Sequence, residues 1–499
     1  MSKNNYQRAM SFIWVGLLMI VALLHIKSAI PDTDTYFLAA TGRYIVENGI
    51  VPTINPFVIH EGLDVIIQQW GFDVMIYELY DNFGNLGLFA YVTIAYSLMI
   101  VLLYRYISLF TKNNWSRSIT MLLSGFLFLP FATVRPTSFT ILSLLSLLYC
   151  VEQYYRTAKV KYLIPLPIIS IVQINMHSSL WPIMFVLMIP YLFPHNVYTK
   201  KEEMLTALKQ WWVRYRWLLL TALIMMGCGF INPNGLNGIL YVFKSYGVAN
   251  QCGIMELQSP TMVSALGILC IAAIILLTAF VASRVRFIKN LNEIYGDVTR
   301  FYMAAGTILL ACMHLRNIWY LILGVMPIVA MVMDKLPAPP IKSKEESNIK
   351  RLAKILGVIA LPCLLAIVLA IPTPYSRYSN EDTPLTPKEA VEYLDNFNKD
   401  DIKLYNEFNN GAYLEWKGYK VYMDARPELF SIKVNNKEDV LTEYINLTNG
   451  ELDYREFLQK YQFTHLLVSN KTMTVFMENA DDYKVVVEGK GYKLFEKIK

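Results

Sequence analysis

The chain has 499 residues, of which 55% are hydrophobic and 17% charged, and a formal net charge of +6. Its mean hydropathy of +0.35 is too high for an ordinary soluble protein of this length and predicts a membrane protein. No basic run resembles a nucleic-acid-binding arm, so we expect no nucleic-acid partner. The scattered cysteines predict neither a disulfide framework nor a metal cluster.

Apolar runs recur along the first 371 residues. A helix needs roughly 17–25 apolar residues to cross a membrane, and such runs predict about eleven transmembrane helices. The first is expected to be retained, because His25, Lys27 and Pro31 follow it instead of a small-residue cleavage site. Several runs are short, notably 162–176 and 180–194, which predicts broken or re-entrant helices. The predicted spans are 10–30, 86–110, 118–134, 138–155, 162–176, 180–194, 217–232, 262–283, 301–315, 317–334 and 352–371.

Lys and Arg residues concentrate in alternate loops between these spans. If the N-terminus is cytoplasmic, the inner loops carry most of them, and an odd number of spans places the C-terminus outside. The outer loops carry few, chiefly Lys27, Arg43, Arg135, Lys244 and Arg316. The sequence therefore predicts a multi-pass protein with a cytoplasmic N-terminus and an extracytoplasmic C-terminal domain.

The chain divides after Ile371, where a proline-broken segment interrupts the apolar pattern. We expect residues 1–371 to form a polytopic α-helical membrane domain with a long first outer loop, 31–85. Residues 372–499 are expected to form a small extracytoplasmic α/β domain. The patterns predict helices at Pro387–Asn396 and Lys437–Leu447, and strands at 402–405, 419–423, 463–468, 483–487 and 492–495.

The first outer loop begins with two carboxylates, Asp32 and Asp34, directly after the first span. An acidic pair at a bilayer boundary costs free energy and tends to be kept for chemistry or ion contact. Residues Asp34–Glu47 and Ile66–Tyr80 can form amphipathic helices that lie in the membrane interface. Simple packing of these helices over the bundle is an equal alternative.

The other outer loops each carry a cationic or imidazole side chain that could neutralise a phosphate: Arg135, His177, Lys244 and Arg316. Each one alone has a simpler explanation, because an Arg at a helix end usually reaches the interface and a lone His usually satisfies a backbone group. Together on one membrane face, they favour an anion site.

The order of the Asp-rich loop with Gly42 and Arg43, Asn55-Pro56-Phe57 and Gln69-Trp70 resembles membrane glycosyltransferases of the GT-C class. The similarity is to the bacterial branch related to mannosyl- and aminoarabinosyl-transferases, which implies the bacterial plasma membrane. Later segments that look like part of this superfamily are Arg135-Pro136, Asn175-Met176-His177, Asn232–Gly235, Glu256–Pro260, His314–Asn317, Asn406–Leu414 and Val421–Arg426.

This resemblance implies transfer of a sugar from a polyprenyl-phosphate donor in the membrane to an extracytoplasmic glycan, lipid or protein acceptor. A first-loop aspartate, Asp32 or Asp34, would be the general base, with inversion at the sugar. Asp34 is favoured slightly because it starts the amphipathic helix, where a carboxylate can also cap. The resemblance assigns the leaving phosphate to Arg135, His177, Lys244 and Arg316, and adds Arg43, Gln69, Asn175, Glu256 and His314 as further site candidates.

Two departures leave other functions open. Related chains often carry Trp-His and a Glu before the Trp where this chain has Tyr36-Phe37 and Gln69-Trp70, so the donor could differ or catalysis could be absent. The alternatives are a lipid-linked-sugar flippase, a scaffold in an envelope-assembly complex, and a polysaccharide polymerase. No cofactor is certain, and the need for a divalent cation stays open.

The C-terminal domain offers two further hypotheses. Asp424 and Arg426 are expected to form a structural ion pair in preference to a second site. A tyrosine-rich face made of Tyr413, Tyr419 and Tyr422 is a candidate surface for the acceptor glycan.

Overall fold

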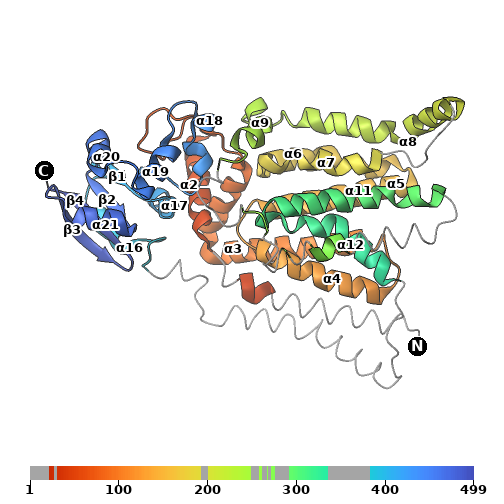
Figure 1. The fold of residues 1–499 in the computed structure, drawn as a ribbon, viewed down its shortest axis with the longest axis horizontal. Helices are drawn as coiled ribbons and strands as arrows, with labels where there is room; N and C mark the ends of the chain where they lie inside the picture. The colour runs from red at the N-terminus through yellow and green to blue at the C-terminus, as the bar shows by residue number, and fades with distance from the viewer. Residues whose placement is uncertain are drawn as a thin grey trace, which may run out of the picture.

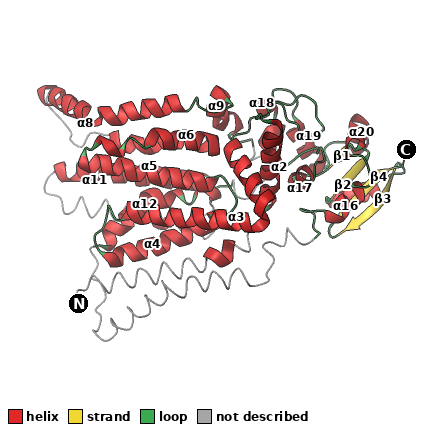
Figure 2. Ribbon diagram, turned by 180° about the vertical axis from the view of Figure 1, so that it is seen from behind, coloured by secondary structure: helices red, strands yellow, loops and turns green. Residues whose placement is uncertain are grey.

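The structure is a computed structural model that describes residues 22–26, 31–192, 201–248, 258–260, 267, 271–275, 291–334 and 382–498. The predicted spans 10–30, 262–283 and 352–371 lie wholly or mostly outside these ranges, as does the predicted domain boundary. Among the described residues, a bundle of roughly parallel helices meets the C-terminal domain at one end, with α2 and α9 between them (Figures 1 and 2).

The bundle is built from helices of very different lengths. Its members are α3 (Trp70–Ile107, second half), α4 (Asn114–Phe128), α5 (Thr137–Thr157), α6 (Leu166–Met176), α7 (Ile183–Met188), α8 (Lys201–Cys228), α11 (Leu291–Met313) and α12 (Tyr320–Met333). Short 3-10 helices interrupt it at η1 (Leu129–Phe131), η2 (Val160–Tyr162), η3 (Ser178–Leu180), η4 (Ile189–Leu192) and η7 (Leu315–Asn317).

Within the described ranges, one helix, α3, is long and apolar enough to cross a membrane, with a mean hydropathy of 2.2 over its best window. Four further apolar stretches are shorter: Val160–Met176, Ser178–Leu192, Thr299–Met313 and Tyr320–Met333. The predicted number of about eleven spans is therefore not supported. Prolines explain part of the difference, because Pro182 and Pro190 fall where 180–194 breaks into α7 and η4. That break agrees with the interpretation of this run as a broken helix.

The predicted amphipathic helices of the first loop are confirmed as helices, and they lie across the end of the bundle (Figure 1). The first is α2 (Thr33–Asn48), which ends at Gly49 in the left-handed conformation. The second is the first half of α3, which bends sharply at Gly84 (φ 57°, ψ −144°) before entering the bundle. Only glycine adopts this backbone conformation without strain, so Gly84 sets the angle between the two halves.

A buried carboxylate joins two helices, α5 and α11, at the opposite end of the bundle. Glu152 of α5 is 1% exposed and accepts from Arg156 on the same helix at 2.6 Å and from Arg300 of α11 at 2.5 Å. The 21 residues of α5 rise about 30 Å, which separates this cluster from the residues just before α5. The role of this cluster is structural, since the two guanidinium groups together compensate the one buried charge of Glu152.

The C-terminal domain combines short helices with one small sheet. Its helices are α16 (Lys388–Leu394), η9 (Lys399–Asp401), α17 (Gly411–Trp416), η10 (Pro427–Phe430), α18 (Ile432–Asn435), α19 (Val440–Asn449), α20 (Tyr454–Tyr461) and α21 (Lys471–Glu478). Its strands are β1 (Leu404–Tyr405), β2 (His465–Val468), β3 (Tyr483–Gly489) and β4 (Tyr492–Lys497). The predicted small α/β domain is confirmed in the described residues.

The sheet has the order β1-β2-β4-β3, with β1 parallel to β2 and the other pairs antiparallel. In register, Leu404 faces His465 across β1 and β2, and Leu466 faces Phe495 across β2 and β4. Four of the five predicted strands are confirmed. The predicted strand at 419–423 is wrong, because this segment bridges Val58 of the first loop and not the sheet.

Candidate functional site

The centre of the candidate site is an ion-pair cluster of three predicted residues. Nε of Arg135 lies 3.2 Å from a carboxylate oxygen of Asp32, and its Nη1 lies 2.9 Å from Asp34. The three residues come from two segments 103 positions apart, at the starts of α2 and α5. The structure thus unites the predicted general base with one predicted phosphate-binding residue.

The two carboxylates differ in what they do for the helix. Asp32 is the N-cap of α2, where it accepts from the backbone N of Thr35 at 3.0 Å and from its hydroxyl at 2.8 Å. The expectation that Asp34 caps the helix is therefore corrected, since Asp34 lies in the first turn instead. Asp32 accepts hydrogen bonds from three donors, so of the two aspartates it has the larger structural role.

The cluster is accessible. The side chain of Arg135 is 36% exposed, and those of Asp32 and Asp34 are 17% and 23% exposed. Arg135 is placed by the entry to α5, where its carbonyl accepts from the hydroxyl of Ser138 at 2.9 Å. Two carboxylates share one guanidinium, so the cluster carries a formal charge of −1 when all three groups are ionised. Arg135 is the group of the three that can bind an anion, in competition with the two carboxylates, and either carboxylate can act as a base.

His177 lies at a buried corner between α6 and η3. Its Nδ1 is 2.8 Å from the hydroxyl of Thr140 on α5, and Gln173 donates to its carbonyl at 2.9 Å. Burial, with a smaller effect of the Arg316 charge, lowers the pKa of His177 to about 3. The imidazole is therefore neutral at physiological pH, and its contacts fit a structural role better than a cationic phosphate contact.

The remaining predicted phosphate-binding residues lie on other elements. Lys244 is on α9 (Gly235–Ser245), where its ammonium group donates to Asn237 at 3.2 Å. Arg316 lies in η7, and His314 precedes it with its ring 6.5 Å from that of Tyr246. The candidate Glu256 lies outside the described residues.

Asn175 and Gln69 shape the corner beside His177. Asn175 accepts from the indole nitrogen of Trp70 at 2.8 Å and donates to the carbonyl of Ile231 at 2.8 Å, which joins α3, α6 and the segment before α9. Gln69 immediately precedes α3, is 6% exposed and lines a small cavity. Asn175 is thus a positioning residue, whereas the side chain of Gln69 hydrogen-bonds that of Asp73 at the edge of the cavity.

Arg43 links the first loop to the C-terminal domain. Its Nη2 donates to the carbonyl of Trp416 at 3.0 Å, and its guanidinium lies 4.7 Å from the centre of the Trp416 ring. This position assigns Arg43 to the contact between α2 and α17.

A second charged cluster, buried and larger, lies where α2 and α3 meet the C-terminal domain. Nε of Arg426 donates to Asp424 at 3.0 Å, and Nη2 donates to both carboxylate oxygens of Glu415 at 3.2 Å. Nη1 reaches the hydroxyl of Thr41 on α2 at 3.3 Å. The predicted structural pairing of Asp424 with Arg426 is confirmed, and the pair also holds two parts of the chain together.

The sequence interpretation missed Glu415 and Asp73 in this cluster. Burial, followed by repulsion from Asp424, raises the pKa of Glu415 well above its ordinary value. Asp73 is 0% exposed, and burial raises the pKa of its carboxyl well above the ordinary value, against the opposing effects of the Arg426 charge and of a hydrogen bond with the Gln69 side chain. The sequence did point to Asp73. Burying a lone carboxylate on the apolar side of a short helix costs free energy, so such a residue is expected to have a structural or functional role.

The predicted tyrosine-rich surface is wrong. Tyr413, Tyr419 and Tyr422 are only 6%, 3% and 0% exposed. The ring of Tyr422 packs against those of Tyr405 and Phe457 in the core of the domain. The large rings of tyrosines commonly contribute buried area to the core of a small domain, and these three do so here.

In the part of the chain that the structure describes, no group of three or more His, Cys, Asp or Glu side chains is arranged to hold a metal ion. Comparison of the sequence with models of known protein families finds no matching family, and no curated protein matches it. The GT-C resemblance accordingly stays a hypothesis that rests on the residues themselves.

Proposed function

We propose that this chain is a membrane glycosyltransferase that transfers a sugar from a polyprenyl-phosphate donor to an extracytoplasmic glycan, lipid or protein acceptor. The observation that carries the proposal is the contact of Arg135 with Asp32 and Asp34. It joins two carboxylates, one of which can act as the general base, to a guanidinium that can bind a phosphate bidentately.

The geometry supports different roles for the two carboxylates. Asp32 is retained by the helix cap, whereas Asp34 is held by Nη1 of Arg135 at 2.9 Å. A donor phosphate that binds Arg135 would compete with Asp34 for the same guanidinium. Arrival of the donor would thereby release Asp34 to take a proton from the acceptor hydroxyl.

In this mechanism the acceptor oxygen attacks the anomeric carbon of the sugar while the bond to the lipid phosphate breaks. The hydroxyl proton passes to Asp34, and the phosphate leaves with the bonding electrons and its negative charge. Arg135 stabilises that charge, which is a large contribution in reactions of this kind. Attack from the face opposite to the phosphate inverts the anomeric centre.

The proposal places several bundle helices in a bilayer. Large apolar side chains are exposed on the outer faces of separate helices, for example Val101 of α3 at 52%, Ile168 of α6 at 65%, Leu223 of α8 at 64% and Leu309 of α11 at 68%. Apolar surface this extensive is costly in water and suits contact with lipid. The same proposal puts α2, the C-terminal domain and the ion-pair cluster on the extracytoplasmic side of a bacterial plasma membrane.

The decisive experiment is turnover of a panel of short-chain polyprenyl-phosphate sugars by the purified protein in detergent, with a matching panel of acceptors. Wild type is compared with Asp34→Asn, Asp32→Asn and Arg135→Gln, and with Glu61→Gln as the control for an exposed carboxylate on the same loop. We expect Asp34→Asn to lower the rate by about 10²–10⁴-fold and Glu61→Gln to leave it unchanged.

Donor binding without turnover in wild type, across the whole acceptor panel, would instead favour the flippase or scaffold alternative. A rate that survives Asp34→Asn but is lost in Asp32→Asn would transfer the role of base to Asp32. Thermal unfolding midpoints within a few degrees of wild type establish that each variant is folded.

A further inference from the structure

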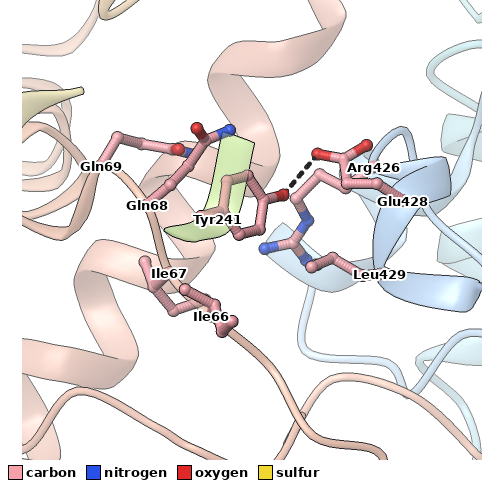
Figure 3. Close-up of a pocket in the computed structure, with 8 residues that line it drawn as sticks. All are labelled: Ile66, Ile67, Gln68, Gln69, Tyr241, Arg426, Glu428 and Leu429. Atoms are coloured by element: carbon pink, nitrogen blue, oxygen red, sulfur yellow. Dashed lines mark hydrogen bonds between the residues drawn. The ribbon is translucent and has the colours of Figure 1, made fainter. Parts of the chain in front are cut away.

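Helix α9 has two unlike faces, and its inner face is fixed by the rest of the chain. In Figure 3 the ring of Tyr241 points from α9 toward the C-terminal domain, where its hydroxyl donates to Glu428 at 2.9 Å. At the start of the helix, the side-chain amide of Asn234 donates to the carbonyl of Ile67 at 2.9 Å. Gly238 and Tyr241 are the buried residues of the helix. These contacts set the rotation of α9 about its own axis.

The outer face of α9 is apolar and exposed. Leu236, Leu240 and Phe243 are 54%, 38% and 71% exposed, and their spacing places them in one stripe about 10 Å long. Lys244 and Asn237 border this apolar stripe on one side, where the ammonium group donates to the amide oxygen at 3.2 Å. An apolar stripe bordered by a cation is typical of helices that lie in a membrane interface.

The apolar stripe continues a longer apolar surface that begins on α8. In Figures 1 and 2, α9 follows the end of α8 at the same edge of the bundle. Residues 217–243 contain no charged side chain. Exposed large apolar side chains recur along them, from Leu220 and Leu223 on α8 through Phe230 to the stripe on α9. Such a surface is costly in water.

The order of these features along the chain selects a bilayer as the occupant. α8 belongs to the bundle, whereas α9 lies between the bundle and the C-terminal domain (Figure 1). A bilayer offers acyl chains along the bundle and phosphate headgroups at its end. The uncharged surface of α8 matches the acyl chains, and the apolar stripe with Lys244 beside it matches the boundary between chains and headgroups.

We infer that α9 docks on the outer leaflet of the bilayer, with its apolar stripe among the upper acyl chains and Lys244 at anionic lipid headgroups. The inference rests on the membrane placement in the proposed function, and it assigns Lys244 to bulk lipid instead of to the donor phosphate. Because the opposite face of α9 bonds Glu428, the same anchor holds the C-terminal domain at a fixed height above the membrane.

The test is photo-crosslinking of the full-length protein in bilayer discs made of equal amounts of phosphatidylglycerol and phosphatidylcholine, without donor or acceptor. The photoreactive residue p-benzoylphenylalanine replaces Phe243 of α9 in one variant and Leu223 of α8 in a second. A third variant carries it in place of Val475, an exposed apolar residue on α21 of the C-terminal domain, as the matched control. Mass spectrometry of the intact protein detects phospholipid adducts.

We expect phospholipid adducts at positions 243 and 223 and none at position 475. Adducts at 223 without adducts at 243, equal yields at 243 and 475, or a cross-link from 243 to a second protein chain would each overturn the docking of α9. In those cases the membrane placement of the bundle stands. Absence of adducts at both 223 and 243 contradicts the membrane placement in the proposed function, and this inference with it.

The role of Lys244 is tested in the variant with the photoreactive residue at position 243. Lys244→Gln should lower the ratio of phosphatidylglycerol to phosphatidylcholine adducts about 5-fold, because a lysine near the surface of an anionic membrane favours anionic headgroups. The matched control is Lys420→Gln, at an exposed lysine of the C-terminal domain, which should leave the ratio unchanged. A ratio that Lys244→Gln also leaves unchanged overturns the contact of Lys244 with anionic headgroups.

Discussion

Arg43 of α2 contacts Trp416 of the C-terminal domain through two interactions, a hydrogen bond and a cation–π contact. Its Nη2 donates to the Trp416 carbonyl at 3.0 Å, and its guanidinium lies over the indole ring at 4.7 Å. The contact is reinforced nearby, where the backbone N of Ile59 donates to the carbonyl of Val421 at 2.9 Å and the backbone N of Val421 donates to the carbonyl of Phe57 at 2.9 Å. The first loop and the C-terminal domain are thus one packed unit at the end of the bundle, and this unit supplies Asp32 and Asp34 of the candidate site.

Replacing Arg43 should loosen this unit. Arg43→Ala removes a hydrogen bond and a cation–π contact, and we expect a loss of about 1–3 kcal/mol in unfolding free energy, read from thermal or denaturant unfolding. Arg455→Ala, an exposed arginine on α20 of the same domain, is the control and should change little. Equal stabilities of the two variants would show that the domain contact does not depend on Arg43.

Gly42 permits the close crossing of α2 and α3. A Cβ atom at this position would lie 2.1 Å from the carbonyl oxygen of Asp73 and 2.7 Å from Cβ of Tyr77, so Gly42→Ala forces the helices apart. We expect a destabilisation of about 1–3 kcal/mol in a thermal unfolding assay. The matched control is Gly306→Ala in α11, where nothing lies within 4 Å of the new atom. That change should be neutral or stabilising, because alanine favours helix.

Glu415 predicts a pH dependence of stability. Burial and the neighbouring Asp424 raise the pKa of Glu415 in the folded state above its ordinary value of 4.5. The folded state therefore holds a proton that the unfolded state has lost, so this stabilising contribution is complete below about pH 4.5 and declines as the pH rises toward the raised value. Glu415→Gln keeps an acceptor for Arg426 and removes the titration.

We expect the unfolding free energy of Glu415→Gln to fall less than that of wild type between pH 5 and pH 8, measured by denaturant unfolding at several pH values. Glu451→Gln, at an exposed position of the same domain, should reproduce the wild-type slope. If the unfolding free energy of Glu415→Gln fell with pH as steeply as that of wild type, the pH dependence would not come from Glu415.

Substitutions of the two first-loop aspartates should differ in their effects on stability as well as on activity. Asp32→Ala removes the N-cap of α2 and should cost about 0.5–2 kcal/mol, whereas Asp32→Asn should cost little because asparagine caps as well as aspartate. Asp34→Asn should leave stability nearly unchanged and lower turnover. Thermal unfolding of the three variants checks the first statement, and an equal cost for Asp32→Ala and Asp32→Asn would contradict the capping role.

Local sequence pattern predicted the elements that short-range physics controls. The helices at Asp34–Glu47 and Ile66–Tyr80 and four of the five strands of the C-terminal domain follow from periodicity and from turn residues. The count of about eleven membrane spans is not supported within the described residues, in part because composition over a window ignores where proline and 3-10 turns break a helix, as at Pro182 and Pro190.

Composition and local pattern were enough to predict an apolar, largely helical chain with a small α/β domain at its end and a carboxylate pair at the start of the first loop. Three features came to light in the folded chain alone: Arg135 pairs with Asp32 and Asp34, Arg426 joins Glu415 to α2, and the tyrosines of the domain point inward. The two kinds of feature depend on interactions of different range. Helix and strand patterns are set by neighbours within a few residues, whereas an ion pair or a buried face depends on which distant segments exclude water from one another.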